Sequence, residues 1–308
     1  PPGPANFVHN ESNTSEFDRA EVNVYVESNI IRDMVISHNP DYPALITPAN
    51  NPFDVNVNIS DSCNAFYNGT SINFFTSGGG CPNTGFSTVV HHEYAHHLVA
   101  VGGSGQGQYG EGTGDVMGIV ITDNPLLAIG WNAGDCNSFL RTAINNKQYP
   151  CTGAIHECGR LYSGSVWSTR NELIVTEPDD YIEILQNLAA NAILLHSGST
   201  ITPQITIDYL TLDDNDDDIG NGTPHYFEID AGFGAHNMAA PELVLLGFNY
   251  PNGRPTESDP NNGAAILVEI VPIVGELDPN QDPLLHVSID GGEFDATPMT
   301  DLGADVFS

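Results

Sequence analysis

Residues 91–97 read His-His-Glu-Tyr-Ala-His-His, and this run constrains the fold more than any other segment of the chain. The apolar pattern of residues 87–101 predicts a helix, and the pair of glycines that follows is typical of a helix end. Residues four positions apart share one face of a helix, so His92 and His96 can reach the same tetrahedral metal ion. We therefore expect this helix to supply two ligands to one metal ion.

The residues around this pair indicate a catalytic metal. Glu93 lies one position round the helix, close enough to take a proton from a water molecule activated by the metal without being a ligand itself. A catalytic zinc ion needs a third protein ligand and an open fourth position. A histidine six residues after His96 would be one choice of third ligand, but Gly102 stands there. Further on, Glu111 can supply the third ligand from a second helix, and Asp115, one turn later, can fix the tautomer of a ligand imidazole.

Four motifs resemble those of the gluzincin metallopeptidases, the group that includes thermolysin and fungalysin. They are Asn-Ala-Phe-Tyr-Asn-Gly at 64–69, His-Glu-x-x-His at 92–96, Glu-x-x-x-Asp at 111–115, and Ile-His-x-x-Gly at 155–159 followed by Gly-Ser-Val-Trp at 164–167. The resemblance spans roughly residues 20–240 in motif order. It implies a two-lobed fold, in which an α/β lobe and a mainly helical lobe enclose a zinc site.

The resemblance also implies a role for each matching residue. The zinc ligands would be His92, His96 and Glu111, with Asp115 behind a ligand histidine and Glu93 as the general base. In this family the strand that matches 64–69 pairs with the substrate backbone, which is a β-augmentation mode of peptide binding. The residues expected to contact substrate are Asn64, Ala65, Tyr67 and Val89, the last in an apolar side-chain pocket. His156 would stabilise the oxyanion, and the alternative for it is a buried structural histidine.

Three departures from the family's pattern stand out. Only 14 residues separate His96 from Glu111, which is a shorter link than thermolysin has. The glutamate that precedes the tryptophan of the fungalysin motif is absent, and residues 160–163 intervene there. No single residue matches the tyrosine that assists the oxyanion in thermolysin, so Tyr109 and Tyr162 are both candidates.

The remaining patterns predict an α+β fold. Strands are expected at 54–59 and 71–75 and a helix at 181–195, whereas residues 17–38 mix helical spacing with a strand-like alternation of valines. After residue 240, β-rich runs at 265–274 and 286–289 are separated by turns, one of them a hairpin turn at 290–292. The expected parts are an α/β lobe at 1–105, a mainly helical lobe at 106–240 and an incomplete, immunoglobulin-like β-sandwich at 241–308.

The composition limits which partners and which cellular compartment suit this protein. The 308 residues carry 40 Asp and Glu against 7 Lys and Arg, and a net charge of −33 repels nucleic acid and anionic membranes. No apolar run approaches the roughly 18 residues of a membrane span. Five cysteines suit an oxidising compartment, with Cys63 and Cys81 as the preferred pair and the pairing of the other three left open. We expect a secreted or cell-surface protein with peptide or protein substrates and with additional C-terminal modules.

A second metal is predicted in the acidic run at 213–218, Asp-Asp-Asn-Asp-Asp-Asp. Alternate oxygens from Asp213, Asn215 and Asp217, or from the three even-numbered positions, could wrap one hard cation such as Ca²⁺. Five carboxylates in six residues would otherwise repel one another. A solvated acidic turn is the alternative.

The sequence thus predicts a secreted zinc endopeptidase, with calcium as a second ion. Two other functions stay open. One is a non-catalytic surface-assembly or adhesion subunit on a peptidase-derived fold, which the β-rich end would suit. The other is a zinc aminopeptidase, although no element that grips a free amino terminus is visible.

Overall fold

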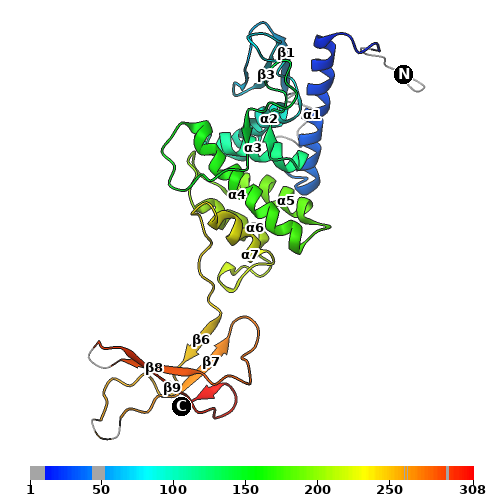
Figure 1. Cartoon of the computed structure of the whole chain (residues 1–308). Coiled ribbons are helices and arrows are strands. Elements are labelled where there is room, and N and C mark those ends of the chain that lie inside the picture. Colours follow the sequence, from blue (N-terminus) through cyan, green and yellow to red (C-terminus); the bar gives the residue numbers. More distant parts are fainter. Residues whose placement is uncertain (1–10, 44–52, 260, 262, 289–290) are drawn as a thin grey trace, which may run out of the picture. The chain divides into compact units, whose positions relative to one another are not determined.

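The structure, a computed structural model, describes residues 11–43, 53–259, 261, 263–288 and 291–308. The chain divides into two compact units: unit 1 holds the chain up to Asp217 together with Thr223–Ala240, and unit 2 holds Asp218–Gly222 together with Pro241–Ser308. The α-helices of the described chain all lie in unit 1, so the predicted mixed α+β class is present (Figure 1). The predicted division of the first 240 residues at residue 105 stays a prediction.

Unit 1 contains seven α-helices and five strands among its described residues. In chain order they are α1 (Glu16–His38), β1 (Asp54–Ile59), β2 (Ala65–Tyr67), β3 (Ser71–Phe75), α2 (Ser87–Gly102), α3 (Gly107–Thr122), β4 (Leu126–Leu127), β5 (Arg141–Thr142), α4 (Ile155–Thr176), α5 (Tyr181–Leu195), α6 (Gln204–Asp213) and α7 (Tyr226–Gly234). The strands expected at 54–59 and 71–75 and the helices expected at 87–101 and 181–195 are thereby confirmed.

Helix α1 settles the ambiguous pattern of residues 17–38. Ser15 caps the helix, because its hydroxyl accepts a hydrogen bond from the Asp18 N–H (3.3 Å). Val24 is buried, while Val22 and Val26 on either side of it are exposed. The buried residues of α1 recur every three or four positions, so helical spacing decides the structure and the alternating valines fall on different faces of one helix.

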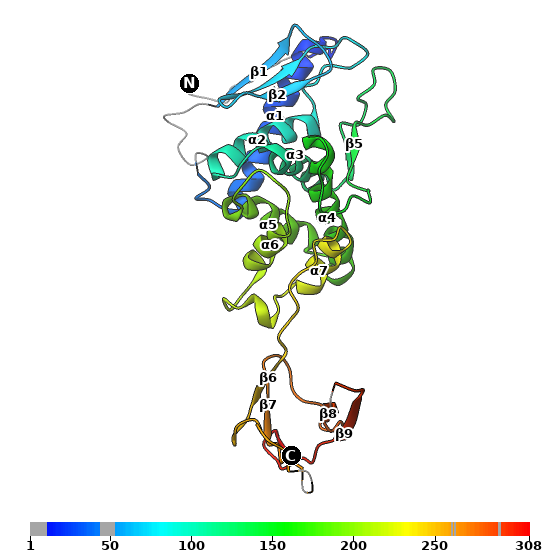
Figure 2. The ribbon, with the colours of Figure 1, turned by 90° about the vertical axis from the view of Figure 1, so that its left-hand side faces the viewer.

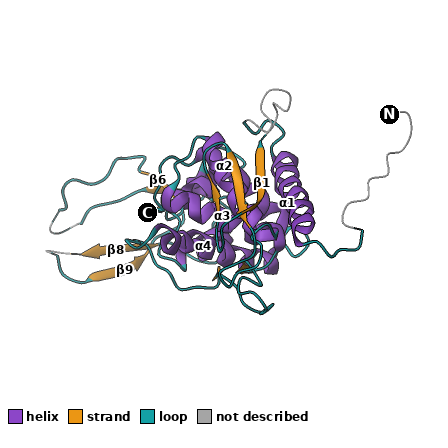
Figure 3. Ribbon diagram, turned by 90° about the horizontal axis from the view of Figure 1, so that it is seen from above, coloured by secondary structure: helices purple, strands orange, loops and turns teal. Residues whose placement is uncertain are grey.

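A three-stranded sheet in the order β1-β3-β2 provides one wall for the site described below. Strand β3 lies in the middle, parallel to β1 and antiparallel to β2, with Ala65 opposite Phe74 and Tyr67 opposite Ile72. Figure 3 shows β1 beside α1, and β2 and β3 pack on α2. Strand β2 lies at the edge of this sheet, so an edge strand is present within the expected segment 64–69, over Ala65–Tyr67.

Helix α3 packs against α2 on one side and α4 on the other (Figure 2). Glycines allow the close approach: a Cβ atom at Gly159 of α4 would lie 2.8 Å from the backbone nitrogen of Gly112 in α3. Helix α2 ends where the sequence predicts, with Gly103 in the left-handed conformation (φ 90°) and its N–H bonded to the Val99 carbonyl. Helix α3 thus packs between α2 and α4, close to α4 at Gly112 and Gly159.

Two disulfides lie in unit 1. Cys63–Cys81 confirms the preferred pair, Cys151–Cys158 is the second bond, and Cys136 is free and exposed. The Cys63–Cys81 bond lies directly before β2, and the Cys151–Cys158 bond joins the loop before α4 to the first turn of that helix. In the described part of the chain, no helix has the length and apolar character to cross a bilayer.

Unit 2 is β-rich. Its elements are a short 3₁₀ turn (Ile219–Asn221), β6 (Leu246–Asn249), β7 (Val268–Pro272), β8 (Leu284–Ser288), β9 (Phe294–Pro298) and β10 (Val306–Phe307). One sheet has the order β10-β7-β6, and β8 and β9 form a separate hairpin. The β-rich runs predicted at 265–274 and 286–289 correspond to β7 and β8, and Asp290 of the predicted turn lies outside the described residues. The buried core comprises Val268, Ile270, Met299 and Phe307.

Candidate metal centre

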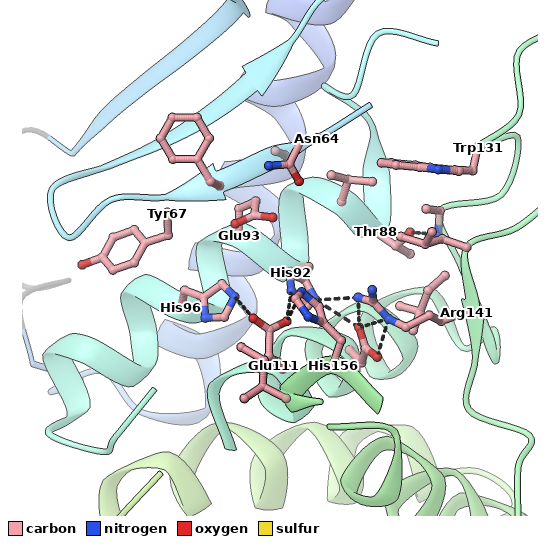
Figure 4. A pocket seen from close by; sticks show the side chains of 18 of the residues that line it. Asn64, Tyr67, Thr88, His92, Glu93, His96, Glu111, Trp131, Arg141 and His156 are labelled. Atoms are coloured by element: carbon pink, nitrogen blue, oxygen red, sulfur yellow. Dashed lines mark hydrogen bonds and ion pairs between the residues drawn. The ribbon is translucent and has the colours of Figure 1, made fainter. Parts of the chain in front are cut away.

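His92, His96 and Glu111 offer ligand atoms that all lie within 4.8 Å of one another. Helix α2 supplies both imidazoles and α3 supplies the carboxylate (Figure 4). The two Nε2 atoms lie 3.2 Å (His92) and 3.8 Å (His96) from the nearer oxygen of Glu111. Ligands about 2.1 Å from one tetrahedral ion are about 3.4 Å apart, so these separations suit a single metal.

The chemistry of the donor set fits such an ion. The Oε2 atom of Glu111 is buried and has no hydrogen-bond partner of acceptable geometry, although two imidazole nitrogens lie near it. Two imidazoles and one carboxylate are a ligand set of catalytic zinc sites, in which the fourth position stays open. Among the described residues, no other set of three or more His, Cys, Asp or Glu side chains converges in this way.

A charged network holds His92. Its Nδ1 lies 3.0 Å from Oδ1 of Asp115, which in turn accepts hydrogen bonds from Arg141 Nε (3.0 Å to Oδ2) and Nη2 (2.6 Å to Oδ1). Asp115 is buried, with 1% of its surface exposed. Gly114 makes room for the ring, because a Cβ atom there would lie 2.6 Å from His92 Cε1. Asp115 therefore lies behind the imidazole of His92, one of the three candidate ligands.

The electrostatics of the three ligands depend on these contacts. Burial alone would lower the pKa of His92, but the carboxylates of Asp115 and Glu111 against its ring outweigh burial and raise that pKa to about 10. Burial, together with the charge of His92, lowers the pKa of His96 to about 4. In the absence of a metal, a proton on His92 thus balances the charge of Glu111. A bound cation would replace that proton, since ligand imidazoles are neutral.

The four residues expected to contact substrate line one cavity of about 440 Å³. Its lining includes Asn64, Ala65, Tyr67, Val89, the three metal ligands, Glu93 and His156. Figure 4 shows Glu93 on the side of the centre that faces β2. Burial raises the pKa of Glu93, which brings this carboxylate closer to the range in which a general base works at neutral pH. The structure thus brings the predicted site residues of unit 1 together, except for those of the acidic run.

His156 lies at the second position of α4, with Nε2 3.1 Å from Oε2 of Glu111. Its side chain is 56% exposed, which does not suit the alternative of a buried structural histidine. The candidate tyrosines behave differently. Tyr109 and Tyr162 are fully buried, stack on each other with ring centroids 5.6 Å apart, and do not belong to the cavity lining. Neither tyrosine is placed to assist an oxyanion in this cavity.

The acidic run lies elsewhere in the fold, at the end of α6. Asp213 is nearly buried, and its carboxylate accepts hydrogen bonds from the Thr223 hydroxyl (2.6 Å) and the His225 N–H (2.7 Å) and contacts the His225 ring (2.6 Å). These bonds make Asp213 an organiser of the turn that leads into α7. Calcium binding by Asp213, Asn215 and Asp217 stays a prediction.

Among the lining residues that the sequence analysis did not predict are Gln106, Trp131 and Arg141. Gln106 contacts His96, Arg141 contacts Asp115, and Trp131 comes from the long loop between β4 and β5. None belongs to a motif. Only Arg141 carried a signal, because basic residues number just 7 in this chain and each one is a candidate partner for a buried carboxylate.

No protein-family model matches the chain, and the search of curated proteins finds no match to it. Function must therefore be inferred from the chemistry of the centre itself.

Proposed function

We propose that this protein is a secreted zinc endopeptidase of the gluzincin type, and that its unit 1 has the two-lobed, thermolysin-like arrangement of that group. The observation that carries the proposal is the convergence of His92, His96 and Glu111 at a cavity that Glu93 also lines. A metal centre with a structural role alone would not need an acidic side chain beside an open ligand position.

In the proposed reaction, His92, His96 and Glu111 would hold a zinc ion, which would supply Lewis acidity to polarise the scissile carbonyl and to lower the pKa of the attacking water. Glu93 accepts the proton that the water loses as its oxygen bonds to the carbonyl carbon. The same carboxyl group then delivers this proton to the amine nitrogen as the C–N bond breaks. His156 donates a hydrogen bond from its ring to the oxyanion, and its position next to Glu111 supports that role.

The edge strand β2 supports a peptide as the substrate. No strand of the described residues pairs with its outer edge, and an extended peptide can add to such an edge through backbone hydrogen bonds. Asn64 and Ala65 at this edge and Tyr67 at its end line the same cavity as the metal ligands. Val89, with Leu127 and Leu140 nearby in the lining, offers an apolar surface to one substrate side chain.

Glu93→Gln tests the proposal. Hydrolysis of casein and of an N-acetylated peptide should fall by about 10²–10⁴-fold, because the variant keeps the shape of the side chain but cannot accept the proton. Glu27→Gln is a matched control. Glu27, in α1, contacts His91 of α2, the helix that carries Glu93 (2.9 Å), but it does not belong to the cavity lining. Zinc content is measured in all three proteins. Full activity in the Glu93→Gln protein would overturn the mechanism, and a failure to cleave N-acetylated peptides internally would point to an aminopeptidase.

The two disulfides support an oxidising compartment and hence secretion or display at the cell surface. A second candidate function, a surface-assembly or adhesion subunit, is favoured by one observation in unit 2. Strand β6 lies at the edge of its sheet and exposes Leu246 (39%) and Phe248 (54%), which is a surface on which another strand can add. Strand exchange between molecules that bind no zinc would favour this second function.

A further inference from the structure

We propose that Gln106 is the positioning residue for His96 and thereby sets the affinity of the centre for its metal. This inference rests on the metal site of the proposed function, but it concerns a residue that does not touch the metal itself. Gln106 lies in the short link between the helices that supply the ligands, immediately before α3.

The side chain of Gln106 makes two hydrogen bonds to one residue. Its Oε1 atom lies 2.8 Å from Nδ1 of His96, and its Nε2 donates to the backbone carbonyl of His96 (2.9 Å). An amide oxygen can only accept, so the hydrogen of the neutral His96 ring must be on Nδ1. The lone pair of Nε2 is then free on the side that faces Glu111. Gln106 thus selects the tautomer and fixes the direction of this ligand.

The backbone around Gln106 is held by a segment far away in the sequence. The hydroxyl of Ser104 lies within hydrogen-bond distance of the Ile193 and His196 carbonyl oxygens (2.5 and 2.8 Å). The Gly105 N–H donates to Gly198 (2.9 Å), and the Tyr109 N–H, on the far side of Gln106, donates to Ser199 (3.1 Å). The link is therefore hydrogen-bonded to residues 193–199 on both sides of Gln106. These bonds fix the backbone position of Gln106 and so place its amide next to His96.

The space for this amide exists because position 110 is glycine. A Cβ atom there would lie 2.5 Å from Gln106 Oε1 and 3.2 Å from His96 Nδ1. Gly110 lies one turn after Gln106, so the two residues face the same side of the helix start. An alanine at this position would push the amide away from His96 without removing it.

A neutral partner suits His96 for an electrostatic reason. The cavity lining already contains the carboxylates of Glu93, Glu111 and Asp115, and Asp115 is balanced by Arg141. Among the described lining residues, Arg141 is the one arginine or lysine, and it is already paired with Asp115, so a further carboxylate at position 106 would have no such partner. An amide orients the ring without adding charge to the cavity, whereas His92 is oriented by a charged pair.

The test measures zinc binding by the full-length, metal-free protein in competition with a chromophoric chelator. Gln106→Ala should raise the Kd for Zn²⁺ by about 10–100-fold, which is the usual effect of losing a partner of a ligand histidine. Gly110→Ala should also raise the Kd for Zn²⁺, because the added methyl group displaces the Gln106 amide. This effect is expected even though alanine is a better helix former than glycine. Gln108→Ala is the matched control: its side chain accepts a hydrogen bond from the Ile201 N–H (3.3 Å), and the expected Kd is within about threefold of wild type.

Thermal unfolding of the metal-free proteins separates positioning from a purely structural role. If Gln106 serves only the fold, Gln106→Ala lowers the Tm and leaves the Kd for Zn²⁺ unchanged. Wild-type affinity in both Gln106→Ala and Gly110→Ala would overturn the inference, and the second variant decides if the first does not fold. Wild type that binds no zinc overturns the inference and the proposed function together. Wild type that binds zinc but shows no Glu93-dependent hydrolysis overturns the proposed function alone, and weakened zinc binding in the two variants still supports the inference.

Discussion

A single methyl group at position 114 should disrupt the metal centre while the protein stays folded. A Cβ atom there would lie 2.6 Å from Cε1 and 2.7 Å from Cγ of His92. Carbon atoms in contact are about 3.5–4.0 Å apart, so the ring must move by about 1 Å. It cannot turn aside freely, because Nδ1 is bonded to the buried carboxylate of Asp115 (3.0 Å). In Gly114→Ala the added methyl group therefore displaces His92, one of the candidate metal ligands.

The size of the effect follows from this displacement. Metal–nitrogen distances in zinc sites hold to about 0.2 Å, so a shift of about 1 Å removes His92 from the coordination shell. We expect the Kd for Zn²⁺ to rise at least about 100-fold, equivalent to about 2.8 kcal/mol. The free energy of unfolding of the metal-free protein should change less than the free energy of zinc binding. Overpacking costs about 1–3 kcal/mol, and replacing a helical glycine by alanine returns about 1 kcal/mol, so the metal-free protein should be destabilised by about 0–2 kcal/mol.

Gly118→Ala is the control for this prediction. Gly118 lies one turn later in α3, and its Cβ atom would meet Leu127 Cδ2 at 2.7 Å, which is the end of a flexible side chain and not a ligand. Both variants are compared by competition for Zn²⁺ and by urea unfolding without metal. Equal zinc affinity in Gly114→Ala and Gly118→Ala, with both proteins folded, would refute the claim that His92 binds the metal from a position against Gly114.

Three further predictions concern charges and ions. Asp115→Asn removes the buried carboxylate that pairs with the mostly buried side chain of Arg141 (16% exposed). The free energy of unfolding of the metal-free protein should therefore fall by about 3–5 kcal/mol in urea titrations, and an unchanged value would contradict the ion pair. The hydrogen bond to Asp213 raises the pKa of His225 above 6.5, so its contribution to stability is complete below that value and is lost as the pH rises through the raised pKa. The difference in unfolding free energy between wild type and His225→Gln should therefore shrink with rising pH, and a constant difference would speak against the pair. If the run 213–218 binds calcium, Ca²⁺ added to metal-free protein should raise its Tm, whereas no shift at millimolar Ca²⁺ would favour a solvated turn.

The grouping of the candidate metal ligands could be predicted from the sequence because helical periodicity is a local property. The spacing of His92 and His96 places both on one face of any helix that contains them, and Glu111 follows on a second helix, after the glycine pair that ends the first. The edge strand at 64–69 was predicted from a motif, and the structure has it at the edge of its sheet. Where the local period was ambiguous, as in residues 17–38, burial of one face against the rest of unit 1 decided for the helix.

Contacts between elements could not be predicted in this way. The pairing of Gln106 with His96 depends on how residues 104–109 dock on residues 193–199, and nothing in the sequence near Gln106 indicates that docking. The two candidate tyrosines show the opposite case. Both lie on helices that supply site residues, yet both face the core, because the direction of a side chain on a buried helix depends on which neighbours surround that helix.

The sequence by itself determined which donors this chain can offer to a metal, since ligand type and helical spacing are encoded in a few adjacent residues. Only the tertiary structure decided how those donors are held. Asp115 with Arg141 fixes one imidazole and Gln106 fixes the other, and both arrangements require helices that approach closely at Gly110 and Gly114. The physical reason is that a hydrogen bond depends on the distance between two atoms, and for residues far apart in the chain that distance is set by packing.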